Sequence, residues 1–363
     1  MFRLCKIVKI IGIVGIFAVS GCDLSTPMHE GDNSKVPSNL RAVSYSSLPG
    51  WRDDDVRYAL QAFRNTCKAK IQYKGSVVPD AELLREKCNM LPSSSADVKT
   101  VRAWFESHFQ PYQVYNENGG KTGTYTGYYS PVIPGCRKQS AECNEPIMGV
   151  PINGANYKGV AKKDIVAKKI GRVLYWANMV DVQNLQIQGS GMLKLEDGSM
   201  VKLNFAAVND MPFKSIGKQL QDKGIKPEGG YSADAVWTHL KKNPKLAKEV
   251  IYNNPRYVYF YETEQKSVIG KLGTPLSKIR SVAMDDSIYT LGLPVYVNTT
   301  LSDGRAFNRL MIAQDTGGAI KGWIRADIFF GSGDEAYKIA HGQHSQGQMF
   351  ILMPKEYTYV KPR

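Results

Sequence analysis

The chain changes its type of local structure three times and has no linker between the resulting segments. It reads as helices, then strands, then helices, then strands, and no Pro- or Gly-rich linker interrupts residues 60 to 340. Its 363 residues are too many for one compact core and suit two domains. Two domains without a linker are expected to be interleaved rather than joined in series. The sequence therefore predicts an α+β protein, mainly β, in which one domain interrupts another.

Helical patterns dominate the first part of the globular region. Apolar residues recur on one helical face there, and Asp53 can cap the first helix. A second helical stretch follows later, with Ser232 as a cap. Helices are expected over 53–70, 81–91, 95–109 and within 214–253.

Strand patterns fill the remaining two segments. Residues 172–208 are rich in β-branched and aromatic types, and an Asp197-Gly198 turn separates two alternating runs. Residues 257–352 read as short strands between Gly, Pro and Asp turns, which is typical of a barrel or a sandwich.

The N-terminus has the layout of a secretory signal peptide. Basic residues precede the apolar run Ile10–Val19, which is too short to cross a bilayer as a helix. Ser20-Gly21-Cys22 then resembles the bacterial lipobox, in which the Cys is lipidated after cleavage. We expect a signal peptide over 1–21, a lipid on Cys22 and a tether over 22–50, rich in Ser, Pro, Asn and Gly. An ordinary signal peptide with a chance Cys is the alternative.

The N-terminus also limits the partners that the basic charge implies. Lys plus Arg exceed Asp plus Glu by 47 − 33 = 14, which favours anionic partners. An exported protein does not meet nucleic acid, so we expect none. The lipid anchor predicts a membrane-attached protein of the bacterial envelope that faces the periplasm. The outer membrane is the expected one, and Asp23 resembles a signal for retention at the inner membrane.

Four cysteines remain after Cys5 and Cys22 are set aside. An even number in an oxidising compartment indicates disulfides, and four cysteines allow three pairings. The nearest-neighbour pairing closes short loops. A zinc site is the alternative, but the spacing has no Cys-x-x-Cys and no adjacent His. The expected pairs are Cys67–Cys88 and Cys136–Cys143.

Short motifs of several enzyme classes fail on inspection. Ser215 and Lys218 match the Ser-x-x-Lys of penicillin-binding proteins, but the Lys-Thr-Gly at 121–123 lies upstream, in the wrong order. His341 and His344 have no acidic third ligand at metal spacing. No phosphate- or dinucleotide-binding glycine motif opens a helix. We therefore expect neither a metal nor a cofactor.

Three aspartates in the C-terminal strand region remain as candidates. Asp285, Asp315 and Asp327 each lie beside apolar, strand-forming residues, where a bare charge is costly. Asp327 precedes Ile328 and Phe329, and an apolar pocket would raise its pKa and keep it protonated, as a general acid requires. The alternative is that these side chains only tie turns, which we expect for Asp285.

The sequence blocks around these three aspartates resemble the 3D domain, which is named for three aspartates. The mature chain resembles the membrane-bound lytic murein transglycosylase A family, and the matching blocks run from about 124 to 331. Besides the aspartates, the blocks that carry the resemblance are Thr126–Val132, Gln186–Gly191, Ser215–Lys218 and Asn254–Phe260.

The resemblance implies a double-psi β-barrel domain with a smaller β domain inserted into it. The barrel is expected from 51–121 and 262–363, including a 3D region at 280–331, and the insert over 122–261. The substrate groove would run between them, a common place for a ligand.

The resemblance also implies an activity, the non-hydrolytic cleavage of the β-1,4 bond between N-acetylmuramic acid and N-acetylglucosamine. By position, Asp327 matches the family's acid and base, Asp315 its supporting aspartate, and Asp285 is the structural one. One carboxyl group suffices because the 6-hydroxyl of the substrate is the nucleophile. A hydrolase would need two.

Peptidoglycan glycan strands are the partner that this activity implies, and a complex for cell-wall synthesis and hydrolysis is a further candidate. The groove candidates are Tyr128, Tyr129, Gln188 and Lys321, because aromatics stack on sugars and a cation meets carboxylates. Core packing for the tyrosines and a solvated Lys321 are the alternatives. Two other functions stay open: a non-catalytic murein-binding lipoprotein, and a murein hydrolase with Asp315 as its second carboxylate.

Overall fold

A computed structural model of the chain describes residues 36–70, 81–152, 154–265 and 267–357. The predicted signal peptide and the lipidation site Cys22 lie outside these ranges. Among the described residues, no helix has both the length and the apolar character needed to cross a membrane.

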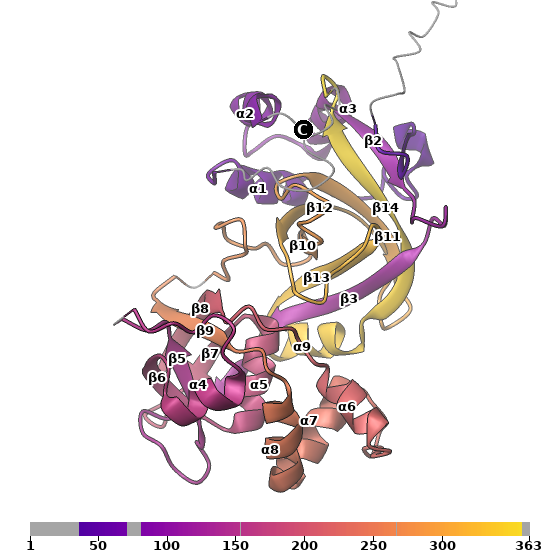
Figure 1. Cartoon of the computed structure of the whole chain (residues 1–363). Coiled ribbons are helices and arrows are strands. Elements are labelled where there is room, and N and C mark those ends of the chain that lie inside the picture. The colour runs from indigo at the N-terminus through magenta and orange to yellow at the C-terminus, as the bar shows by residue number, and fades with distance from the viewer. Residues whose placement is uncertain (1–35, 71–80, 153, 266, 358–363) are drawn as a thin grey trace, which may run out of the picture. The chain divides into compact units, whose positions relative to one another are not determined.

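Six strands close into a barrel (Figure 1). Each strand pairs with the next, and the last, β3, pairs back with the first, β14. The barrel mixes parallel pairs, such as β10 with β12, and antiparallel pairs, such as β10 with β13. In order around the barrel the strands are β14 (His344–Pro354), β11 (Pro294–Thr300), β12 (Ala306–Asp315), β10 (Ser281–Met284), β13 (Arg325–Ser332) and β3 (Gly123–Ser130).

The N-terminal helices cover part of this barrel. Buried side chains of α1 (Arg57–Thr66) and α3 (Val98–His108) join barrel residues such as Tyr296 and Phe350 in one apolar cluster. Aromatic side chains fill much of that cluster, so burial of large apolar area holds the helices in place. The short helix α2 (Ala81–Asn89) is joined to the end of α1 by the disulfide Cys67–Cys88, one of the pairs that the sequence predicts.

The segment before α1 differs from the prediction. Residues 40–50 belong to the fold, because β1 (Leu40–Ala42) pairs with β2 (Phe109–Val114), and Leu40 and Leu48 are buried. The predicted tether is wrong there. The prediction that Asp53 caps the first helix is also wrong, since the helix begins four residues later.

The inserted region has its own two sheets and its own core. Its core joins Ile133, Leu185 and Leu203 with other apolar side chains. The disulfide Cys136–Cys143, the second predicted pair, also lies here. The strands are β4 (Val132–Pro134), β7 (Ser190–Lys194), β8 (Met200–Val208) and β9 (Val258–Thr263) in one sheet, and β5 (Glu145–Gly149) with β6 (Arg172–Ala177) in the other.

Helices surround these sheets. The helices α7 and α8 pack on each other and on α5 through apolar residues such as Leu240 and Ile251. Ser232 caps α7 as predicted, because its side chain accepts a hydrogen bond from the Ala235 N–H. The helices of the insert are α4 (Lys162–Lys168), α5 (Met179–Gln188), α6 (Ile216–Asp222), α7 (Ala233–Lys242) and α8 (Pro244–Asn253).

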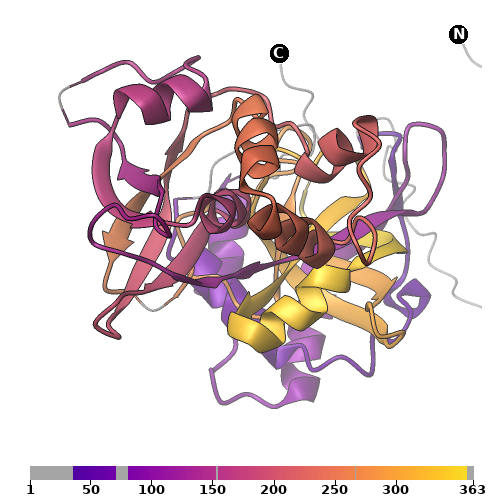
Figure 2. The ribbon, with the colours of Figure 1, turned by 90° about the horizontal axis from the view of Figure 1, so that it is seen from below.

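Three features of the fold depart from the sequence prediction. The helix α5 lies where the sequence predicted strand, and α9 (Gly333–Gly342) interrupts the predicted C-terminal strands (Figure 2). The strand β3, which was assigned to the insert, belongs to the barrel. It packs closely against α9, because Gly127 has no Cβ, and an added one would lie 3.0 Å from the Ala340 Cα of that helix.

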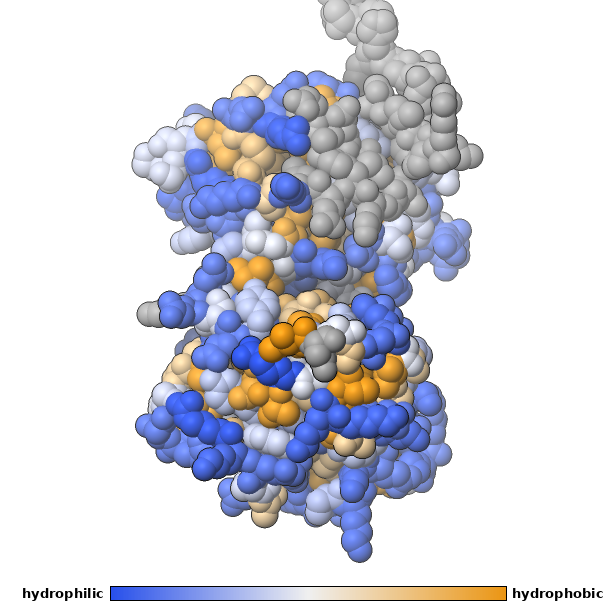
Figure 3. All heavy atoms as spheres, turned by 60° about the vertical axis from the view of Figure 1, so that its left-hand side comes forward, coloured by the Kyte–Doolittle hydropathy of each residue, from blue (hydrophilic) through white to orange (hydrophobic). Residues whose placement is uncertain are grey.

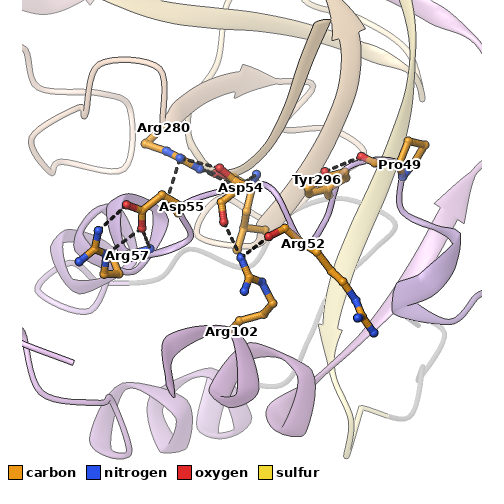
Figure 4. A network of polar contacts seen from close by, with 9 residues as sticks. Pro49, Arg52, Asp54, Asp55, Arg57, Arg102, Arg280 and Tyr296 are labelled. Carbon is orange, nitrogen blue, oxygen red and sulfur yellow. Dashed lines mark hydrogen bonds and ion pairs between the residues drawn. The ribbon is translucent and has the colours of Figure 1, made fainter. Parts of the chain in front are cut away.

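A buried ion pair joins the N-terminal segment to the barrel (Figure 4). The guanidinium of Arg280 donates to both carboxylate oxygens of Asp54, at 2.8 and 2.7 Å, and both side chains are buried. The backbone N–H of Leu310 also donates to Asp54, at 2.8 Å. Arg280 directly precedes β10, so this pair fixes the start of that strand.

We predict that Asp54→Asn destabilises the protein by about 3–5 kcal/mol, because it leaves the buried Arg280 cation without its partner. The matched control is Asp55→Asn, since the side chain of the neighbouring Asp55 is paired with Arg57 at the surface, at 2.6 Å. That change should cost about 1 kcal/mol or less. Urea unfolding of both variants measures the difference, and equal small losses would contradict the importance of the buried pair.

Candidate active site

The sheet brings two of the three aspartates to one face of the barrel. Asp315 ends β12, Asp327 lies in β13, and β10 runs between these strands. Ala283 of β10 lies opposite both of them. Side chains of directly opposed residues point to the same face of a sheet, so both carboxyl groups project from one face of the barrel sheet. Two strand spacings separate their Cα atoms by about 10 Å.

A β-bulge gives Asp315 this direction. The register between β10 and β12 shifts after Val282, so Ala283 lies opposite Asp315 instead of Gln314. Gln314 is buried and donates to the Ala62 carbonyl oxygen of α1 at 3.0 Å. Successive side chains of β12 therefore serve different purposes, one anchoring a helix and the next facing the site.

Both aspartates line a cavity of about 690 Å³, a size typical of small-ligand sites. Barrel and insert both contribute to its wall. Exposed apolar side chains of the insert, such as Phe205 and Tyr261, belong to the wall, and Figure 3 shows apolar side chains exposed among hydrophilic ones on one face. Other lining residues include Tyr128, Gln186, Gln188, Ser190, Asn254, Arg256, Lys271, Ala283, Gly318, Lys321 and Arg325.

Asp315 is held by three hydrogen-bond donors. The backbone N–H groups of Lys271 and Thr316 donate to its Oδ1 at 2.9 and 3.0 Å, and the Tyr128 hydroxyl donates to its Oδ2 at 2.9 Å. Burial nevertheless raises the pKa of Asp315 to about 6, because loss of solvation outweighs these bonds and the nearby Asp327 adds to it. Both carboxylate oxygens are therefore already occupied.

Asp327 has a different environment. The Thr126 hydroxyl donates to its Oδ1 at 2.6 Å, and Arg325 in turn donates to the Thr126 oxygen at 2.8 Å. Burial raises the pKa of Asp327, while the Thr126 bond and the Arg325 charge limit the rise. Within the described part of the chain, its Oδ2 accepts no hydrogen bond. One oxygen of Asp327 thus stays available to a ligand in the cavity.

Asp285 ties a loop. It is buried and accepts hydrogen bonds from Lys321 Nζ at 2.8 Å, from the Gly322 N–H at 2.9 Å and from Ser287. Burial acts to raise the pKa of Asp285, but these hydrogen bonds outweigh it and the net pKa is lowered. Lys321 lines the cavity while paired with this carboxylate.

The other predicted residues divide into two groups. Tyr128 and Gln188 line the cavity, and Gln188 accepts a hydrogen bond from the backbone N–H of Tyr129 at 3.1 Å. Tyr129 is not part of the wall; its ring packs on Tyr337, and its hydroxyl accepts from Asn184. This arrangement matches the core-packing alternative for Tyr129.

The Ser-x-x-Lys match has an ordinary structural explanation. Ser215 is the N-cap of α6 and accepts a hydrogen bond from the backbone N–H of Lys218. Among the residues with described positions, no three His, Cys, Asp or Glu side chains gather in a way that could hold a metal ion.

Four residues of the wall and its support have no role in the sequence prediction: Thr126, Arg256, Ala283 and Arg325. The period of two in β3 could have indicated Thr126, because Thr126 and Tyr128 lie on one face and bond Asp327 and Asp315 respectively. Arg325 shares the face of Asp327 by the same period in β13, whereas Ala283 became visible only through strand pairings and Arg256 only through a loop distant in sequence.

We predict that the stabilities of Asp315→Asn and Asp285→Asn, each relative to wild type, change with pH in opposite directions. A folded-state pKa raised to about 6 means that Asp315 lowers the stability as the pH rises from about 4 to 6. Asp315→Asn removes this penalty, so its melting temperature relative to wild type should be higher at pH 7.5 than at pH 4. Asp285→Asn is the matched control. Its parent carboxylate has a lowered pKa, so that variant should lose most above pH 4. Equal shifts at both pH values would contradict the buried state of Asp315.

Two family descriptions match the chain. The MltA specific insert domain matches residues 124–261, and the 3D domain matches residues 280–353. Membrane-bound lytic murein transglycosylase A of Escherichia coli is 32% identical over 238 residues, which cover 63% of this chain and 65% of that protein. The matched region thus spans slightly less than two thirds of this curated relative.

Solved structures extend the likeness over most of both chains. A membrane-bound lytic murein transglycosylase from Agrobacterium tumefaciens superposes with a TM-score of 0.77 at 26% identity, covering 87% of this chain and 98% of that one. The lytic transglycosylase LtgG of Burkholderia pseudomallei is 32% identical with a TM-score of 0.57, covering 89% and 97% respectively. The barrel with its insert, the 3D region and these likenesses together show that the chain belongs to the membrane-bound lytic murein transglycosylase A family.

Proposed function

We propose that this chain is a murein lytic transglycosylase that cleaves the β-1,4 bond between N-acetylmuramic acid and N-acetylglucosamine without water. The observation that carries the proposal is Asp327, a carboxyl group in the wall of a cavity, with a raised pKa and one oxygen that accepts no hydrogen bond from the described residues. A raised pKa favours the protonated form of this carboxyl group, which is the form that a general acid needs.

Asp327 would act first as an acid and then as a base. Its proton passes to the glycosidic oxygen while the bond from that oxygen to C1 of the muramic residue breaks. The resulting carboxylate then accepts the proton of the muramic 6-hydroxyl, whose oxygen bonds to C1. The product ends in 1,6-anhydromuramic acid, and Asp327 regains its proton. The reaction consumes no water and needs no second carboxylate.

Asp315 fits a supporting role in this scheme. Its oxygens already accept from Lys271, Thr316 and Tyr128, which leaves little capacity for work on a substrate. A two-carboxylate hydrolase remains the second candidate. The Cα separation of about 10 Å, set by two strand spacings, is compatible with two carboxyl groups that flank a water molecule.

A murein-binding protein without catalysis is the third candidate. Exposed apolar groups such as Phe205 and Tyr261 in the cavity wall would serve binding equally well. Such a protein has no use for a partly buried carboxyl group whose pKa is raised, and this favours the enzyme.

We further propose that a lipid on Cys22 attaches the chain to an envelope membrane, facing the periplasm. The relatives are named membrane-bound, which supports attachment. The outer membrane is the proposed site, and Asp23 keeps the inner membrane as the alternative.

Asp327→Asn should keep the fold and lose about 10²–10⁴-fold or more in rate, because an amide can neither donate nor accept this proton. Asp315→Asn should lose less if Asp315 only supports the site. Turnover of purified murein gives the rates, and thermal melting of each variant controls for folding. Full activity of Asp327→Asn would exclude this residue as the acid.

The wild-type products should end in 1,6-anhydromuramic acid, one water lighter than the reducing sugar that a hydrolase leaves. Mass spectrometry of murein digests distinguishes them. Reducing-end muramic acid as the main product would favour the two-carboxylate hydrolase even if Asp327 is essential, and intact murein would favour the binding protein.

Cys22→Ala should release the protein from the membrane fraction, because the acceptor of the lipid is gone. Cys5→Ala is the matched control, since Cys5 lies in the segment that cleavage removes, and that variant should stay attached. Fractionation of cells measures both. Unchanged attachment of Cys22→Ala would rule out the lipid anchor, and separation of the two membranes in the wild type tests the effect of Asp23.

A further inference from the structure

Arg256 is a partly buried cation in the wall of the cavity. It lies between α8 and β9, so the insert supplies it. The neighbouring wall on the barrel side is the loop that follows Asp315 and contains Gly318. Arg256 therefore bridges the two walls of the same cavity.

The absence of a side chain at Gly318 makes room for the guanidinium group. A Cβ added there would lie 3.3 Å from Arg256 Cζ and 3.4 Å from both terminal nitrogens. Contacts of 3.3–3.4 Å are tighter than most Cβ contacts in proteins. The flat group thus occupies space that a side chain at position 318 would crowd.

The donors of Arg256 are largely unused. A guanidinium carries five N–H donors, and within the described chain this one donates a single long hydrogen bond, to the Met211 carbonyl oxygen at 3.4 Å. No described carboxylate lies within ion-pair distance of it, and the nearby Asp210 is paired with Lys158 at 2.8 Å. A partly buried cation without a partner is costly, which favours an anionic ligand.

The other cationic side chains of the wall are either paired, hydrogen-bonded or exposed to solvent. Lys321 is paired with Asp285, Arg325 donates to the Ala326 carbonyl oxygen and to Thr126, and Lys271 is exposed. Among the described wall residues, Arg256 thus combines partial burial with unused donors.

We propose that Arg256 binds a carboxylate of the glycan substrate and so distinguishes murein from neutral glycans of the same linkage. This inference rests on the proposed function. A planar guanidinium matches a carboxylate with two parallel hydrogen bonds. Murein offers such a group in two places: the lactyl carboxylate of a muramic residue whose stem peptide has been removed, and the carboxylates of the stem peptide itself. Polymers of N-acetylglucosamine alone have none.

The test measures binding to the full chain carrying Asp327→Asn, so that no ligand is consumed. The ligands are peptide-free murein strands, peptide-bearing strands and a neutral N-acetylglucosamine hexamer. Arg256→Gln is the main variant, and Arg256→Lys tests whether the planar group matters beyond its charge. Lys214→Gln is the matched control, because it removes one exposed cation of the same region outside the cavity wall.

Arg256→Gln should weaken binding of at least one anionic ligand roughly tenfold, the loss expected for one charged hydrogen-bonding pair, and leave the hexamer nearly unchanged. Arg256→Lys should recover only part of the loss, and Lys214→Gln should match the parent. A loss confined to peptide-free strands assigns the lactyl carboxylate, and a loss confined to peptide-bearing strands assigns the stem peptide.

Equal losses for the hexamer and the anionic strands, or no loss for either anionic ligand, would overturn the role of Arg256. A failure of the proposed function is separate, because it appears as wild-type protein that leaves murein uncleaved or releases reducing ends. The binding preference can be measured in either case.

Discussion

The geometry of the site depends on the buried ion pair between Asp54 and Arg280. It connects a segment near residue 50 with the residue that precedes β10, the strand between the two aspartate-bearing strands. Ion pairs of this kind contribute little net stability compared with well-packed apolar residues, but they tolerate no loss of one partner. The pair therefore restricts how the N-terminal helices and the barrel can dock, and this docking sets the position of the strand at the floor of the site.

The apolar residues around the site raise the pKa of its carboxyl groups. Ile328 and Phe329 are buried, and the strand that holds them also carries Asp327. A carboxyl group between such neighbours loses solvation, and this burial alone is enough to raise its pKa. The two carboxyl groups then differ in their hydrogen-bond donors, because among the described residues Asp315 accepts three hydrogen bonds and Asp327 one. Two aspartates of one barrel thus acquire different chemical capacities.

The sequence predicted the features that depend on local patterns and on a recognised family. It predicted an interrupted barrel, both disulfide pairs, the cap at Ser232 and the three aspartate blocks. It missed α5 because polar and apolar residues alternate over 184–188, as in a strand. The Asn178 side chain that caps the helix and the left-handed Gly189 that ends it were the local signals for a helix. Arg256 was given no role because it reaches the site from a loop distant in sequence from the aspartates, whereas the period of two in β3 was an overlooked local signal for Thr126.

The bulge in β12 makes the direction of the Asp315 side chain depend on the number of residues in that strand. Gln314 and Asp315 are adjacent, yet one reaches α1 and the other the cavity, because one residue is left out of the pairing with β10. A regular ladder in place of the bulge would put Gln314 opposite Ala283, so that the amide would point to the cavity and the Asp315 carboxylate to the other face of the sheet. Insertions and deletions near residue 314 should therefore be rarer among active descendants of this chain than substitutions. A comparison of gap positions would detect this constraint even where the residues themselves have changed.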